Sequence, residues 1–76
     1  MVENIVIHTE WIKLDQLLKL AGKVQTGGQA KEAVLSGQVS LNGEICLMRG
    51  RKVRPGDRVV FGGDELAVTA PAGGAE

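Results

Sequence analysis

Residues 37–46 read GQVSLNGEIC, and this stretch predicts a β-hairpin. Short apolar segments at 39–41 and 44–46 stand on either side of Asn42-Gly43. Asn-Gly is favoured at the centre of a type I′ turn, because both central residues of that turn need a positive φ. We therefore expect antiparallel strands over 39–41 and 44–46, with Cys46 as a small buried hydrophobic side chain in the second strand.

Two helices are expected on the N-terminal side of this hairpin. The first covers 13–21, where apolar residues recur at helical spacing and so share one face: Leu14, Leu17, Leu18 and Ala21. The second covers 28–36, and its apolar face has smaller side chains: Ala30, Ala33 and Val34. We expect Thr26 or Gly27 to be the N-cap of the second helix, since both residue types are favoured there.

The other segments predict short strands and a turn. A β-branched run at 4–8 predicts a strand in which His8 takes its place by alternation, and 58–61 and 65–69 predict two more strands. Arg54-Pro55-Gly56-Asp57 predicts a type II turn, because proline fixes φ at one central position and glycine supplies a positive φ at the next. Residues 47–54 are basic and aperiodic, so we expect a loop or an irregular edge there.

The expected order is strand, helix, helix and four strands, which is an α+β fold with two packed helices against a small, mostly antiparallel sheet. A chain of 76 residues forms one small domain, placed at 1–69, with a frayed tail at 70–76. One cysteine excludes an internal disulfide framework, and with one histidine it excludes a four-ligand zinc cluster. No apolar run approaches the ~20 residues of a membrane span, and no signal peptide pattern is present. We therefore expect a cytoplasmic monomer without membrane, metal, cofactor or small-molecule substrate.

The charge of the chain is segregated, although its net value is zero. All nine lysines and arginines lie within residues 13–58, a span that holds only four acidic residues and carries +5. The flanking segments carry −5. This asymmetry indicates either a surface that faces a polyanion or charges scattered over a solvated loop.

Thr26-Gly27-Gly28-Gln29-Ala30-Lys31 is the stretch with the most specific chemistry. A helix N-terminus presents unpaired N–H groups and a partial positive charge. Glycines there let a phosphate approach the backbone closely, and Lys31 adds a full charge. The alternative is a plain N-cap with glycines that serve the turn. A nucleotide P-loop is excluded, because the Lys-Ser/Thr pair of that motif is absent.

Two further features have alternative interpretations. Arg49-Gly50-Arg51-Lys52 can bind phosphate through paired arginine hydrogen bonds, or it is an exposed solubilising loop. Trp11 can stack on a base or fill the junction between sheet and helix, and we expect the junction, because a lone large aromatic in a small domain is usually core. No pattern gives His8 a nucleophile or a metal partner, and no carboxylate pair or triad is evident. We therefore expect no catalytic site.

An ordered set of motifs runs from Lys13 to Phe61: Lys13-Leu14-Asp15, Leu17-Leu18, Ala30-Lys31, Gly37-Gln38-Val39-Ser40-Leu41-Asn42-Gly43, Val53 and Gly56-Asp57. Together they resemble the RNA-binding domain named after small-subunit ribosomal protein S-four. Lys13 stands where that family usually has arginine, and Thr26-Gly27-Gly28 stands where it often has Ser-Arg. The Thr-Gly-Gly-x-Ala-Lys and Arg-Gly-Arg-Lys segments are similar to those of short, stand-alone bacterial members.

The resemblance implies a non-enzymatic module whose two helices and hairpin bind structured RNA, commonly ribosomal or transfer RNA. We expect docking on the phosphate backbone, with specificity from RNA shape rather than base readout. The expected RNA-binding residues are Lys13, Lys19, Lys23, Thr26, Gly27, Gly28, Gln29, Lys31, Asn42, Arg49, Arg51 and Lys52. The competing hypothesis is a protein-interaction module that uses the sheet or the apolar helix face.

Overall fold

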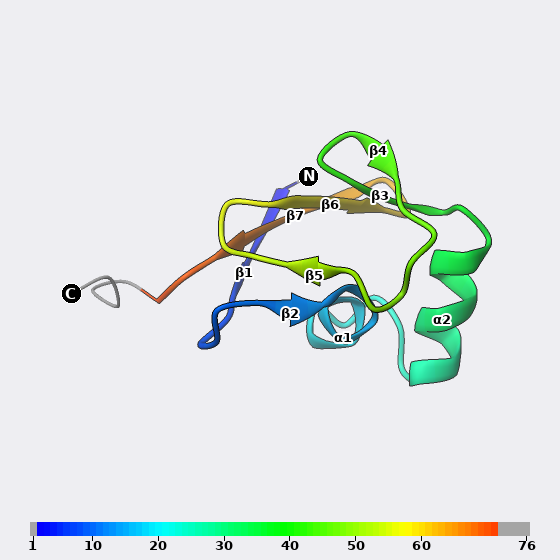
Figure 1. The fold of residues 1–76 in the computed structure, drawn as a ribbon, viewed down its shortest axis with the longest axis horizontal. Helices are drawn as coiled ribbons and strands as arrows, with labels where there is room; N and C mark the ends of the chain where they lie inside the picture. The colour runs from blue at the N-terminus through cyan, green and yellow to red at the C-terminus, as the bar shows by residue number, and fades with distance from the viewer. Residues whose placement is uncertain (1, 72–76) are drawn as a thin grey trace.

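The structure is a computed structural model that describes residues 2–71 (Figure 1). The described elements in chain order are β1 (Val2–Val6), β2 (Ile12–Lys13), α1 (Leu14–Leu20), α2 (Gly27–Leu35), β3 (Val39–Leu41), β4 (Glu44–Ile45), β5 (Lys52–Val53), β6 (Arg58–Phe61) and β7 (Asp64–Thr69). Both expected helices are confirmed to within a residue of their expected bounds. Within residues 2–71, no helix is long and apolar enough to cross a membrane.

Five strands form one sheet, in the order β1-β7-β6-β3-β4. β1 runs parallel to β7, and the other neighbouring pairs of this sheet are antiparallel. The expected α+β fold with a mostly antiparallel sheet is therefore confirmed. The tail expected at 70–76 follows β7, and its residues 72–76 lie outside the described residues.

The two helices pack against each other on one side of this sheet (Figure 1). Their apolar faces are buried as expected: Leu14, Leu17 and Leu18 on α1, and Ala30, Ala33 and Val34 on α2. These side chains share one core with sheet residues that include Val39, Val59, Leu66 and Val68. Each fully buried leucine or valine stabilises the fold by about 1.5–3 kcal/mol relative to an exposed one, so this core fixes how the helices sit on the sheet.

The two turns that the sequence predicts are both present. Asn42 and Gly43 have φ values of 52° and 88°, which are the two positive angles that a type I′ turn requires. Gly56 has φ of 101°, and the Asp57 amide donates a hydrogen bond to the Arg54 carbonyl at 3.0 Å. This is the geometry of the expected type II turn.

The segment 47–54 contains a strand where we expected only a loop. Within it, β5 pairs with β2 as a separate two-stranded antiparallel sheet, with Ile12 opposite Val53. Val53 is fully buried and Ile12 packs against the core, so burial of these two side chains holds the pair. Strands of two residues are too short to show a period, which is why the sequence did not predict β2 or β5.

Two placements near the strand ends also differ from expectation. β1 begins and ends two residues before the expected 4–8, and His8 lies exposed in the following bend. The pairing with β7 ends in a hydrogen bond from the Ile7 amide to the carbonyl of Thr69, the last residue of β7. Cys46 lies just beyond the end of β4 and is only half-buried, not buried within the strand.

Candidate functional site

The β2–β5 pair has one apolar side and one basic side. Side chains alternate between the two faces of a strand, so the neighbours of the inward Ile12 and Val53 point outward. These neighbours are all exposed: Trp11, Lys13, Lys52 and Arg54. Lys13 and Lys52 stand directly opposite each other across the pair. Like charges in this position destabilise strand pairing.

Backbone hydrogen bonds attach the basic segment to the start of α1. The amides of Leu14 and Asp15 donate to the carbonyls of Arg51 and Arg49, at 2.9 and 3.1 Å. These amides belong to the first turn of α1, and the N–H groups of a first turn have no carbonyl acceptor within their own helix. The carbonyls therefore occupy the N-terminus of α1, and the Arg49 and Arg51 side chains are exposed, with Arg51 lining a hollow beside the β3–β4 hairpin.

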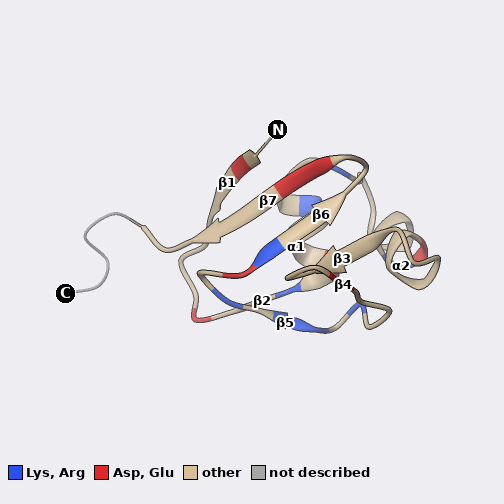
Figure 2. Ribbon diagram, turned by 90° about the horizontal axis from the view of Figure 1, so that it is seen from above, with Lys and Arg blue, Asp and Glu red and all other residues tan. Residues whose placement is uncertain are grey.

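We call this surface the basic ribbon face; it consists of Lys13, Arg49, Arg51, Lys52 and Arg54. One weak restraint on it is the 3.8 Å contact between Arg49 Nη1 and Oδ2 of the nearly buried Asp15. Figure 2 shows basic residues along β2 and β5 on one side of the molecule and acidic residues on β1 and β7 on the other. The basic residues of β2 and β5 are thus separated in space from the acidic residues of β1 and β7, whereas Lys23 and Arg58 form ion pairs with acidic residues of those strands.

The N-terminus of α2 is arranged as the sequence predicts. Thr26 is the N-cap, and its Oγ1 accepts a hydrogen bond from the Gln29 amide at 3.1 Å. The Gln29 Oε1 accepts from the Gln25 amide at 2.8 Å. Gly27 has open space where a Cβ would be, and at Gly28 the nearest atom would be Thr26 Oγ1 at 3.8 Å. The backbone at the two glycines is therefore open to approach, and Lys31 is exposed nearby on the same helix.

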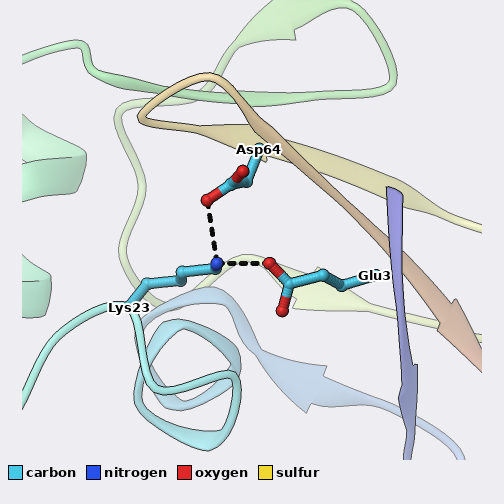
Figure 3. A network of polar contacts seen from close by, with 3 residues as sticks. All are labelled: Glu3, Lys23 and Asp64. Carbon is cyan, nitrogen blue, oxygen red and sulfur yellow. Dashed lines mark hydrogen bonds and ion pairs between the residues drawn. The ribbon is translucent and has the colours of Figure 1, made fainter. Parts of the chain in front are cut away.

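Lys23 is placed differently from the other candidate cations. Its ammonium forms ion pairs with Glu3 on β1 and with Asp64 on β7, the latter at 2.9 Å (Figure 3). The hydrogen bond to Glu3 and then that to Asp64 raise the pKa of Lys23, while the hydrogen bond from Lys23 lowers the pKa of Asp64. These contacts tie the α1–α2 connection to the sheet, and they leave only 17% of the Lys23 side chain exposed.

Asn42 also has structural partners. Its Nδ2 donates to Asp57 Oδ1 at 3.2 Å, and its Oδ1 accepts from the Arg58 amide at 2.9 Å. The side chain thus joins the β3–β4 hairpin to the turn before β6. Lys19 is exposed in the last turn of α1, where a cation complements the helix dipole.

The structure adds two residues that the candidate set lacked, Arg54 and Trp11. The expectation that Trp11 fills the junction between sheet and helix is wrong, because the residue is 36% exposed. The Lys52 Nζ lies 4.8 Å from the centroid of its ring. Because the Ile12 side chain points toward the core, the side chain of its neighbour Trp11 points outward. Alternation across 11–13 is the signal that could have located Trp11, but only once β2 is known to be a strand.

Comparison with known proteins gives consistent matches over most of the chain. The family model described as "S4 domain" matches residues 5–69. The chain is 44% identical over 63 residues to the Bacillus subtilis protein named "Probable ribosome maturation protein RlbA", covering 83% of this chain and 89% of that one. It is 37% identical over 59 residues to the Escherichia coli protein named "Putative RNA-binding protein YbcJ", covering 78% and 84%.

A solved structure is similar as well. The solution structure of YbcJ from E. coli superposes with a TM-score of 0.69 and 32% sequence identity, covering 88% of this chain and 86% of that one. Its authors describe it as revealing an "ALFAL motif involved in RNA-binding". The likeness therefore extends from sequence to fold.

Proposed function

The chain belongs to the S4 domain family, and from this premise we propose that it is a non-catalytic module that binds structured RNA. In this proposal the phosphate backbone docks on the basic ribbon face and on the open N-terminus of α2. Lys13, Arg49, Arg51, Lys52 and Arg54 supply the charge, while Gly27 and Gly28 supply backbone amides. Lys23 and Asn42 contribute indirectly, by holding the elements in place.

The observation that carries the proposal is the facing pair Lys13 and Lys52. Two cations opposite each other in a short strand pair lower its stability, and Arg54 adds a third charge to the same outward face. A polyanion that binds across this face removes the repulsion and gains several charge-assisted contacts at once. The acidic residues of β1 and β7 lie on another side of the molecule (Figure 2), where Glu3, Asp64 and Glu65 form ion pairs with other cations.

Ribosomal RNA is the target that we favour within this class. The name of the B. subtilis relative refers to ribosome maturation, and the name of the E. coli relative refers to RNA binding. The chain has one tryptophan, one phenylalanine and no tyrosine, too few aromatics for a sheet that stacks several successive bases. Recognition is therefore expected to rely mainly on the shape of a folded RNA and the spacing of its phosphates.

A salt series tests the proposal. With about five phosphates neutralised, log K falls with log salt at a slope of about −3.5 for loop or single-stranded RNA. Binding then weakens roughly 100-fold between about 50 and 200 mM salt. A labelled ribosomal RNA fragment is the probe, and a flat titration would contradict phosphate docking.

A matched pair of variants locates the charge. Lys13→Gln with Lys52→Gln should reduce the magnitude of the salt slope by about 1.4, because each lost phosphate contact changes it by about 0.7. Arg58→Gln removes one charge from β6, where Arg58 forms an ion pair with Glu65, and should leave the slope close to that of the wild type. If each removed charge reduced the salt slope equally in the Lys13/Lys52 variant and in the Arg58 variant, the basic ribbon face would not be the docking surface.

One observation favours a second function, protein binding. Ile45, Leu47 and Met48 are exposed by 67%, 55% and 66% around a hollow of about 260 Å³ beside the β3–β4 hairpin. Neighbouring exposed apolar side chains are typical of protein interaction sites. A complex held by this surface persists at high salt, whereas the RNA complex does not, so one titration separates the two functions.

A further inference from the structure

We propose that Trp11 stacks on an unpaired nucleobase of the bound RNA. The inference rests on the proposed function and deepens it: the basic ribbon face would hold a nucleotide by its base as well as by its phosphates. The stack requires an unpaired base in single-stranded or loop RNA, whereas phosphate docking alone does not.

The backbone around Trp11 keeps its ring on the outward side of β2. Ile12, the next residue, packs against the core, and alternation then directs Trp11 away from it. The Thr9 hydroxyl donates a hydrogen bond to the Trp11 carbonyl at 2.8 Å, which orders the bend before β2. The ring therefore stays on the surface, although a tryptophan is the side chain with the most apolar area to bury.

The surroundings of the ring match the chemistry of a single nucleotide. Lys13, Lys52 and Arg54 share its face of the β2–β5 pair, so cations stand beside an exposed aromatic. Sites for single-stranded nucleic acid combine these same two components, a basic track for phosphates and an aromatic ring for a base.

The Lys52 ammonium, 4.8 Å from the ring centroid, does not block such a stack. An exposed cation–π contact is weaker than a base–aromatic stack, and Lys52 is a flexible side chain. A base can displace the ammonium from the ring and leave it beside the adjoining phosphate. The two contacts then support each other, since both belong to one nucleotide.

The fluorescence of Trp11 reports the stack directly, because the chain has one tryptophan and no tyrosine. The probes are two short RNA hairpins with the same stem, one with an adenosine loop and one whose loop sugars carry no bases. Both present the same phosphates. At about 50 mM salt, where phosphate contacts are strong, we expect both to bind, and only the adenosine loop to quench the emission of Trp11.

Three variants separate the stack from the charge, with affinity read from labelled RNA and folding from circular dichroism. Trp11→Leu should weaken binding to the adenosine hairpin by roughly tenfold, the effect of losing one base–aromatic stack, and leave the abasic hairpin unchanged. Trp11→Phe should retain most of the preference for bases. Lys52→Gln should reduce the salt slope for both hairpins but keep the quenching.

Two outcomes overturn the inference, and they differ from each other. If both hairpins bind but quench equally, and Trp11→Leu binds both like the wild type, then the base does not stack on Trp11 while phosphate docking stands. If neither hairpin binds even at low salt, the proposed function fails and the stack fails with it.

Discussion

Gly28 and Lys23 show how differently single residues of one candidate set are used. Gly28 leaves a helix N-terminus open, with no side chain and only Thr26 Oγ1 near its missing Cβ. Lys23 is not open to a ligand in this way, because its ammonium forms ion pairs with two carboxylates of the sheet. One residue is a candidate for contact with phosphate, and the other orders the surface on which that contact depends.

The Gly28 backbone can be tested without loss of the fold. Gly28→Ala meets ordinary van der Waals distances and should be neutral or slightly stabilising, because alanine is the better helix former. Gly28→Val should bind RNA more weakly than Gly28→Ala, since its branched side chain keeps a phosphate from the amide. Gln16→Val, at an exposed position of α1, is the control for the helix-propensity cost of valine. Wild-type RNA affinity in both glycine variants would mean that no phosphate binds here.

The Lys23 ion pairs predict a pH dependence of stability. The contribution of Asp64 is present above its ordinary pKa of 3.8 and is lost as pH falls from there through its lowered pKa in the folded state. The contribution of Lys23 is present below 10.5 and is lost as pH rises through its raised pKa. Lys23→Met should lower the melting temperature at neutral pH, where Glu3 and Asp64 would be left without their shared cation.

The same substitution at Lys19, an exposed lysine in the last turn of α1, is the matched control and should lower the melting temperature by less, because it removes only the interaction of a cation with the helix dipole. The difference between the two variants should shrink as the pH falls below 3.8, because the stabilising contribution of Asp64 is lost from there down through its lowered pKa. Thermal melts followed by circular dichroism measure both effects. An equal melting temperature for both variants at neutral pH would show that the Lys23 ion pairs do not stabilise the fold.

At the scale of elements, the sequence predicted the elements that have a local signal, and it did not predict those that depend on long-range contacts. The helices have apolar periodicity, the β3–β4 hairpin has Asn42-Gly43, and each signal lies within the element that it predicts. β2 and β5 exist only because residues 12–13 meet residues 52–53. No local sequence pattern predicts this long-range pairing, and the outward position of Trp11 depends on the pairing. The ion pairs of Lys23 with β1 and β7 are unpredictable for the same reason.

The hairpin turn offers a test of one local signal. Gly43→Ala places a Cβ on a residue with φ of 88°, which costs about 1–2 kcal/mol. For a domain of this size, each kcal/mol lowers the melting temperature by about 4–8 °C. Gly50→Ala is the control, because Gly50 has the same open space but no positive φ. Similar melting temperatures for the two variants would contradict the turn assignment.

At the scale of the whole molecule, positive and negative charges are unevenly distributed, although the net charge is zero. Opposite sides of the molecule carry the basic ribbon face and the acidic residues of β1 and β7 (Figure 2). Local fields act over about 8–10 Å at physiological salt, so a bound polyanion responds to the nearby cations more than to the net charge.

Chromatography at pH 7 can detect this distribution. The protein should be retained on immobilised heparin at low salt, despite its zero net charge, and released as salt rises. Lys13→Gln with Lys52→Gln should elute at lower salt than a charge-matched pair of substitutions, Lys19→Gln with Arg58→Gln. Passage of the wild-type protein through the column without retention would contradict a basic surface that is strong enough to dock RNA.

The parallel pairing of β1 with β7 has a consequence for synthesis. Val2 lies beside Glu65 and Val6 beside Thr69, so β1 is synthesised long before β7, its partner, which is complete only when residue 69 has been made. The helices and the β3–β4 hairpin can form earlier, from contacts close in sequence. A nascent chain must therefore keep an unpaired β-branched strand in solution while its core forms, and attachment of that strand completes the sheet.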